Sequence, residues 1–176
     1  MAAFAGVVFM SDALGRALIF DRASVLHGEV WRLWTGNVVH FGESHLLWNL
    51  AVLVPTGIWA ETIAPRATRW LLALAPVLIG ATLLVLQPTL GRYAGLSGVA
   101  AGLLALLAFT QLTRPRDDHW FWWALLGLLA LKIVAEAYSD HPLLARFSQP
   151  GLHTAPLAHL AGIAVAAVIH RVSRRI

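Results

Sequence analysis

Long hydrophobic runs fill most of the chain, and charged residues separate one run from the next. Five runs contain no Asp, Glu, Lys or Arg: residues 44–60, 70–91, 93–113, 119–131 and 147–170. A helix needs about 20 residues to cross roughly 30 Å of hydrocarbon. The pattern predicts one membrane helix in each run. A sixth is expected at residues 2–20, as one continuous helix in which Asp12 and Arg16 pair across one turn.

The composition places these helices in a membrane. Hydrophobic residues make up 59% of the 176 residues and charged residues only 12%, against about 25% charged in soluble domains. We expect an all-α integral membrane protein, with residues 1–176 forming one domain. The chain has no cysteine, which excludes disulfides, a thiol nucleophile and a c-type haem site. Its formal charge of +4 concerns topology in the lipid bilayer rather than nucleic acid.

The arginines favour one orientation of the six predicted helices. If both termini lie on the inner side, seven arginines fall in inner segments and four in outer ones. The inner ones are Arg66, Arg69, Arg114, Arg116, Arg171, Arg174 and Arg175, and the outer ones are Arg22, Arg32, Arg92 and Arg146. The excess predicts an N-in and C-in topology.

Four polar residues share one depth in this topology. His45 and Asn49 lie in the first turns of the second helix, Ser97 heads the fourth, and His159 lies near the head of the sixth. These three helices all begin at the outer face. With a rise of 1.5 Å per residue, each polar residue lies roughly 5–12 Å below that face. The fold is therefore expected to bring together residues that are far apart in the sequence.

The fourth helix is short, which affects the setting of Ser97. Residues 98–113 extend over only about 24 Å, so the helix must begin below the outer surface and residues 88–96 must dip inward. Irregular backbone at this depth requires a cavity or burial in protein. A serine at such a helix start, within the sequence GLSG at 95–98, has an accessible hydroxyl and free backbone N–H groups. These are the parts of a nucleophile and an oxyanion site.

The chemistry of these groups predicts their roles. Ser97 attacks a carbonyl, and His159 takes the serine proton and later donates it to the leaving amine. The oxyanion is met by the backbone N–H groups of Ser97 and Leu96 and by the side chains of Asn49 and His45. No Asp or Glu is expected at this depth, so the prediction is a Ser–His dyad. This chemistry requires no metal and no organic cofactor.

Other interpretations of the same residues stay open. A serine between glycines is common in helix packing, and His45 with His159 is also a pattern for b-type haem ligation or proton transfer. Lys132 and Glu136, one turn apart on the fifth helix, are expected to neutralise each other or to contact the tail of a substrate.

The chain resembles the rhomboid intramembrane serine proteases over nearly its whole length. Matching motifs are "WR" at 31–32, "HFGESHLLWN" at 40–49, Gly57 with Glu61, "GLSG" at 95–98 and "HLAG" at 159–162. The resemblance implies a six-helix fold, catalytic roles for Ser97 and His159, and oxyanion roles for His45 and Asn49. It also implies structural roles for Arg32 and Glu61. One position differs: many rhomboids have a tyrosine stacked on the catalytic imidazole, where this chain has Ala101.

The compact chain is also similar to the rhombosortase branch, as are "GEVWRLWTGNVVH" at 28–40 and the Lys132–Glu136 spacing. That branch implies a multi-pass protein of the bacterial inner membrane with its active site open to the periplasm. Its substrates are exported proteins with a C-terminal Gly-Gly motif, a hydrophobic span and a basic tail. A catalytically inactive rhomboid-like protein that binds membrane proteins is the alternative.

Overall fold

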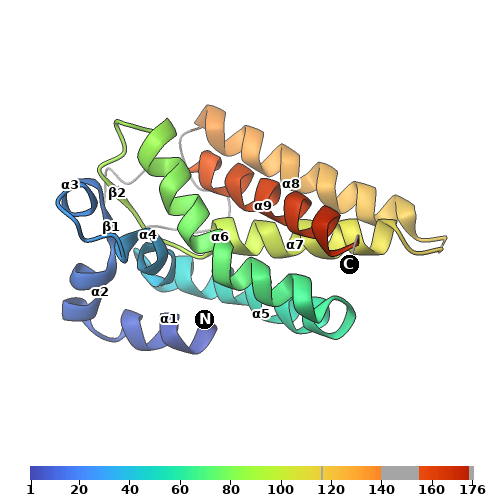
Figure 1. Cartoon of the computed structure of the whole chain (residues 1–176), viewed down its shortest axis with the longest axis horizontal. Coiled ribbons are helices and arrows are strands. Elements are labelled where there is room, and N and C mark those ends of the chain that lie inside the picture. Colours follow the sequence, from blue (N-terminus) through green and yellow to red (C-terminus); the bar gives the residue numbers. More distant parts are fainter. Residues whose placement is uncertain (116, 140–154, 175–176) are drawn as a thin grey trace.

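Five helices of the described residues pack into the bundle that forms the body of the molecule (Figure 1). The computed structural model describes residues 1–115, 117–139 and 155–174. The helices are α5 Glu43–Ile63, α6 Pro65–Leu86, α7 Ser97–Leu112, α8 His119–Ser139 and α9 Pro156–Ser173. Four of them are long and apolar enough to cross a membrane, and α7, with 16 residues, is shorter. The helices predicted from the hydrophobic runs are confirmed, apart from residues 147–154, which lie outside the described ranges.

Small elements gather at the end of the bundle where α5, α7 and α9 begin (Figure 1). We call this end, with residues 11–42 and 87–96, the loop end. Strand β1 (Phe20–Asp21) pairs antiparallel with β2 (Arg92–Tyr93), which ties the N-terminal segment to the chain just before α7. The other elements are α2 Asp12–Leu18, α3 Arg22–Leu26, α4 Arg32–Thr35 and the 3-10 helix η1 Gly36–Val38.

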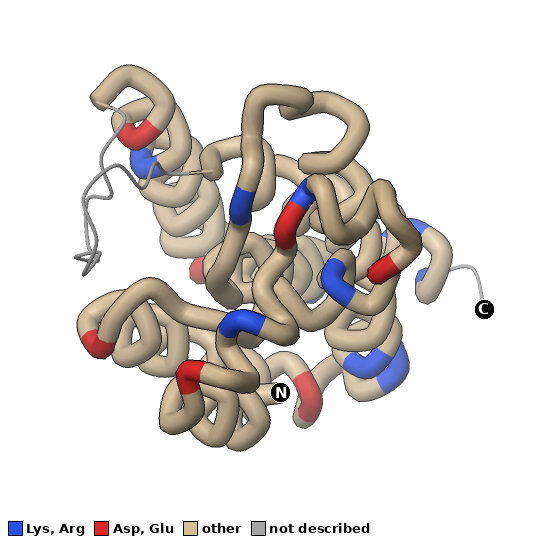
Figure 2. The backbone as a smooth tube through the Cα atoms, turned by 90° about the vertical axis from the view of Figure 1, so that its left-hand side faces the viewer, with Lys and Arg blue, Asp and Glu red and all other residues tan. Residues whose placement is uncertain are grey.

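The opposite end of the bundle carries most of the inner arginines predicted from the sequence. We call it the arginine end; its described arginines are Arg66, Arg69, Arg114, Arg171 and Arg174. At the loop end, by contrast, basic and acidic residues lie side by side (Figure 2). Two such pairs are Arg32 with Glu29 at 2.6 Å and Arg92 with Asp21 at 3.2 Å.

The N-terminal segment differs from its prediction. The expected helix over residues 2–20 is broken into α1 (Ala2–Phe9) and α2. The side chain of Ser11 accepts a hydrogen bond from the backbone N–H of Leu14 at 3.4 Å and so caps a new helix. The predicted ion pair between Asp12 and Arg16 does not form, although both residues lie in the described part. With eight residues, α1 is only about 12 Å long.

Helix α7 is the centre of the bundle, and its contact with α9 depends on glycines. It packs against α5, α6, α8 and α9. A Cβ atom added at Gly98 would lie 2.7 Å from the carbonyl oxygen of Ala158, and one at Gly102 would lie 2.8 Å from that of Gly162. Even an alanine at these two positions would therefore collide with backbone. The missing side chains allow the backbones of α7 and α9 to touch.

Candidate active site

Ser97 is the first residue of α7 and the accessible point of a buried stretch. Every other residue from Tyr93 to Leu103 is buried, whereas Ser97 is partly exposed. Leu96 precedes the helix without a side-chain cap, so the first backbone N–H groups of α7 are not satisfied by capping. The predicted burial of the irregular segment at 88–96 is confirmed for residues 93–96 only, because residues 88–92 are exposed or partly exposed.

His159 lies on α9 beside the head of α7. Its neighbour Ala158 contacts Gly98, and Gly98 follows Ser97, so the glycine contact between the two helices brings the Ser97 and His159 positions together. His159 is 5% exposed. Its Nδ1 atom is buried and makes no hydrogen bond in the structure.

His45 and Asn49 reach the same place from α5. Gly95, two residues before Ser97, has φ +123°, a conformation that favours glycine. A Cβ atom there would lie 2.6 Å from both Cε1 and Nε2 of His45 and 3.5 Å from Nδ2 of Asn49. These side chains therefore lie against the backbone that leads into Ser97. All four residues of the predicted layer thus come from three helices to one region.

The backbone orients the ring of His45. The N–H of Phe41 donates to its Nδ1 at 3.3 Å, so the neutral ring carries its proton on Nε2, the atom that faces Gly95. The ring of His40 meets that of His45 edge to face at 5.0 Å. Burial lowers the pKa of His40 to about 4, so this neighbour is neutral at neutral pH. Asn49 adds a buried Nδ2 that has no hydrogen-bond partner.

Tyr93 belongs to this region and was not found from the sequence. Its buried hydroxyl donates to the carbonyl oxygen of Gly95 at 2.9 Å and contacts the Ser97 side chain and the Gly98 backbone N–H. Burial raises the pKa of Tyr93 above its usual range, so the phenol stays protonated. A single aromatic residue in an irregular segment has no periodicity; its only signal is its place four residues before Ser97.

Glu136 overturns the expectation that no carboxylate lies near His159. Its Oε2 atom is 3.7 Å from Nδ1 of His159 and accepts a hydrogen bond from Nζ of Lys132 at 2.6 Å. The Glu136 side chain is 3% exposed. The expectation was wrong because α8 ends at the loop end, where α9 begins, and Glu136 lies on the buried face of α8 with Leu129 and Ile133. Of the two interpretations of Lys132 and Glu136, the mutual pair is observed.

Arg32 and Glu61 lie away from this layer. The Arg32 guanidinium donates to the backbone carbonyls of Arg16 and Ile19 at 3.0 and 2.8 Å and to Glu29 at 2.6 Å. It thereby ties α4 to the chain around α2. Glu61, near the arginine end of α5, pairs with Arg69 at 2.6 Å on the surface.

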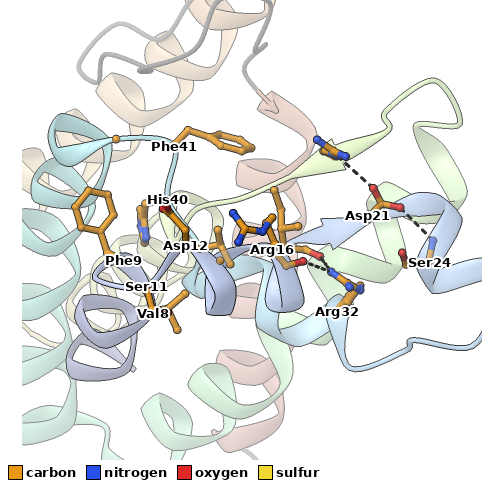
Figure 3. Close-up of a pocket in the computed structure, with 15 residues that line it drawn as sticks. Val8, Phe9, Ser11, Asp12, Arg16, Asp21, Ser24, Arg32, His40 and Phe41 are labelled. Atoms are coloured by element: carbon orange, nitrogen blue, oxygen red, sulfur yellow. Dashed lines mark hydrogen bonds and ion pairs between the residues drawn. The ribbon is translucent and has the colours of Figure 1, made fainter.

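A pocket of about 770 Å³ opens at the loop end next to this layer (Figure 3). Residues of α1, α2, both strands and the 39–42 segment line it, and neither Ser97 nor His159 is among them. His40 and Phe41 line the pocket and also contact the ring of His45, His40 edge to face and Phe41 stacked. His40 and Phe41 thus connect the pocket wall to His45 of the candidate site. Within the described ranges, no three His, Cys, Asp or Glu side chains are grouped to hold a metal ion.

The sequence of this chain matches a known protein family. The family described as "Rhomboid domain" matches residues 27–175, which is most of the chain and includes every residue of the polar layer. A search of curated proteins finds no match.

Proposed function

This chain belongs to the rhomboid family of intramembrane serine proteases, and we propose that it is an active endopeptidase with Ser97 as nucleophile and His159 as general base. One observation carries the proposal: Gly98 and Ala158, the chain neighbours of the partly exposed Ser97 and of the buried His159, are in backbone contact. A serine packed only for structure has no need of access in an otherwise buried stretch.

The proposed reaction is acyl transfer to Ser97 followed by hydrolysis. Oγ of Ser97 attacks the carbonyl carbon of the scissile peptide bond while Nε2 of His159 takes the hydroxyl proton. The tetrahedral intermediate then collapses, the C–N bond breaks, and His159 donates the proton to the leaving amine. Water attacks the acyl-enzyme by the same route, with His159 again as base, and releases the carboxylate product and free Ser97.

Four donors are proposed to stabilise the oxyanion. Two are the backbone N–H groups of Ser97 and Leu96 at the uncapped start of α7. The other two are Nε2–H of His45 and Nδ2–H of Asn49. Three observations support the side-chain donors: the Phe41 N–H sets the His45 tautomer, the Asn49 amide lacks a partner, and both lie against Gly95.

We propose an N-in and C-in orientation in the bacterial inner membrane, with the loop end at the periplasmic face. The arginines at the opposite end support it, because positive residues concentrate on the cytoplasmic side. In Figure 1, α1 runs toward the loop end, as the first of six membrane segments should. This segment extends only part of the way across the bilayer.

The proposed substrates are exported proteins that carry a Gly-Gly pair at the outer head of a C-terminal hydrophobic span. This specificity follows from the similarity to rhombosortases and from the shallow site. A substrate helix must unwind to present a carbonyl to Ser97, and glycine weakens a helix by about 1 kcal/mol relative to alanine. Glycine also lets the substrate backbone approach the head of α7 closely.

The experiment uses the purified full chain with a single-span reporter that carries Gly-Gly at the head of its C-terminal span. Ser97→Ala and His159→Ala should each abolish cleavage while the protein still inserts and purifies. Because the two residues act as a unit, the double variant should be no worse than either single one. Ser173→Ala and His170→Ala, at the far end of α9, are the matched controls and should cleave normally.

Specificity is tested on the reporter rather than on the enzyme. Leu-Leu in place of Gly-Gly should block cleavage through helix strength and bulk, and Ala-Ala should slow it. If all three reporters are cleaved at the same rate, the proposed rhombosortase specificity is refuted, and the proposed protease activity stands. If the Ser97→Ala protein cleaves as fast as the parent, the proposed serine protease mechanism is refuted. If the parent chain binds the reporter without cutting it, the chain is an inactive rhomboid-like binder.

A further inference from the structure

His159 needs an acceptor for its Nδ1 proton if it is to act as the base at Nε2. In a neutral imidazole only one nitrogen carries the proton, so a basic Nε2 facing Ser97 requires Nδ1–H. This Nδ1 is buried and makes no hydrogen bond in the structure. A buried donor without an acceptor favours the other tautomer, which would leave Ser97 without a base.

Glu136 is the carboxylate that faces this atom. Its Oε2 lies 3.7 Å from Nδ1 of His159, and both side chains are almost fully buried, at 3% and 7% exposure. A shift of less than about 1 Å brings the two atoms within hydrogen-bond distance. Catalytic hydrogen bonds are often long before substrate binds, so the observed gap is compatible with such a contact.

The packing of α8 explains why Glu136 points at His159. Ala101, one turn after Ser97 on α7, packs against Leu129 and Ile133 of α8. Glu136 follows Ile133 by three residues and therefore lies on the same face of α8. Ala101 has a small side chain, so no aromatic ring stands at this position to hold the imidazole.

Lys132 completes the arrangement. Its Nζ donates to the same Oε2 at 2.6 Å, and its side chain is 27% exposed while that of Glu136 is buried. A lone buried charge is costly, and the ammonium group of Lys132 supplies the counter-charge for the Glu136 carboxylate. Among the described residues, the charged or titratable groups near Glu136 include Lys132 on its own helix and His159 on α9, and His45 of α5 lies near both of these.

We propose that Glu136 is the third member of this site: a positioning residue whose carboxylate accepts a hydrogen bond from Nδ1–H of His159. The inference rests on the proposed serine protease function. Glu136 holds the imidazole in the tautomer that presents Nε2 to Ser97, and it stabilises the imidazolium that forms when the serine proton is taken. The carboxylate keeps its negative charge throughout, and no proton is transferred to it.

The alternative is a purely structural role, in which Glu136 only neutralises the charge of Lys132. Two variants separate the alternatives: Glu136→Gln and the double variant Lys132→Met with Glu136→Gln. In the single variant, Lys132 keeps the amide oxygen, so the amide N–H₂ faces Nδ1 and favours the wrong tautomer. The double variant replaces the ion pair by neutral side chains of similar size, a change that buried pairs generally tolerate.

The principal readout is the rate at which a fluorophosphonate probe labels Ser97 in the purified full chain. It reports activation of the nucleophile without substrate docking, and melting is followed in parallel. Both variants should label at least tenfold more slowly than the parent, and up to about 10⁴-fold, with melting temperatures within a few degrees. With the Gly-Gly reporter, kcat should fall while KM stays within about twofold. Glu61→Gln, which alters an exposed carboxylate that is also 2.6 Å from a basic partner, should label normally.

The double variant decides the question. If it labels at the parent rate, Glu136 serves only Lys132 and the proposal is overturned, while the protease assignment stands. If Glu136→Gln alone fails to fold, slow labelling of a folded double variant still supports the proposal. Failure of the underlying function has a different signature: the Ser97→Ala protein would take up the probe and cut the reporter as the parent does.

Discussion

Two pairs of acidic and basic side chains have the same separation of 2.6 Å and lie at opposite ends of the bundle: Lys132 with Glu136, and Arg69 with Glu61. Glu136 is 3% exposed and faces a histidine, whereas Glu61 is 39% exposed and its partner Arg69 is 74% exposed. A short distance is therefore a poor guide to what a pair does. Burial and the third group nearby are better guides.

The same contrast extends to the two ends of the molecule. At the loop end, Arg32, His45, Asn49, Glu136 and His159 are buried polar residues that converge from several elements. At the arginine end, most charged side chains are exposed, as membrane interfaces allow. Buried polar groups are sensitive to the loss of one partner, and surface groups are not. We therefore expect substitutions at the loop end to have much larger effects.

The largest effect is expected from Gly162→Leu. A side chain at Gly162 would collide with the backbone carbonyl of Gly98, so α9 must move away from α7 and separate His159 from Ser97. Overpacking of this kind costs about 1–3 kcal/mol, and cleavage should be lost. Gly127→Leu on α8 is the control, because nothing lies within 4 Å of that position. Cleavage and melting in detergent measure both variants, and normal cleavage by Gly162→Leu would refute the contact argument.

The second-largest effect is expected on the cleavage rate, with the stability of the protein unchanged. Asn49→Ala removes one proposed oxyanion donor and should lower the cleavage rate by about 10²–10³-fold, with little change in melting temperature. Thr56→Ala is the matched control, because Thr56 is also a buried polar residue of α5 but lies seven residues further from the loop end. Equal rates in the two variants would make Asn49 a packing residue.

Arg32→Met should mainly lower stability. The guanidinium holds two backbone carbonyls and Glu29, and charged hydrogen bonds of this kind contribute about 1.5–3 kcal/mol. The control is Arg92→Met, since Arg92 is 69% exposed and its pair with Asp21 should contribute about 1 kcal/mol or less. Melting temperatures in detergent should fall several degrees for the first variant and little for the second. The reverse order would show that burial does not govern these loop-end contacts.

Much of the fold and the core of the candidate site could be predicted from the sequence. Charge-free runs locate α5 to α9, because each such run must leave water. Helix rise alone predicts one shared layer for His45, Asn49, Ser97 and His159, and the structure brings their helices together there. Helix rise gives a position only along the helix axis, however. It does not show which residues of two neighbouring helices face each other.

The features that were not predicted depend either on which residues of two helices face each other or on local hydrogen bonds that compete with a continuous helix. Glu136 faces His159 because α8 turns its Leu129 and Ile133 face inward against Ala101 of α7, and Glu136 lies on that face. Tyr93 sits in irregular backbone, where no period indicates a direction. The break after α1 reflects a local cap at Ser11, which outweighs the hydrophobic continuity of the segment. The Ser-Asp sequence at 11–12 is itself a helix-start signal.

The smallest effect is expected from Glu61→Ala. This change breaks the pair with Arg69, but both side chains remain accessible to water, so the loss in unfolding free energy should be about 1 kcal/mol or less. Because the charges are screened, the difference from the parent should shrink further as salt rises from about 0.05 to 1 M. Cleavage per folded molecule should stay at the parent rate, since Glu61 lies at the end of the bundle opposite Ser97. Melting curves of Glu61→Ala and Glu136→Gln at both salt concentrations compare the contributions of the two carboxylates to stability. A loss of turnover in Glu61→Ala as large as that in Glu136→Gln, with an unchanged melting temperature, would mean that the two ends are coupled and that exposure alone does not distinguish them.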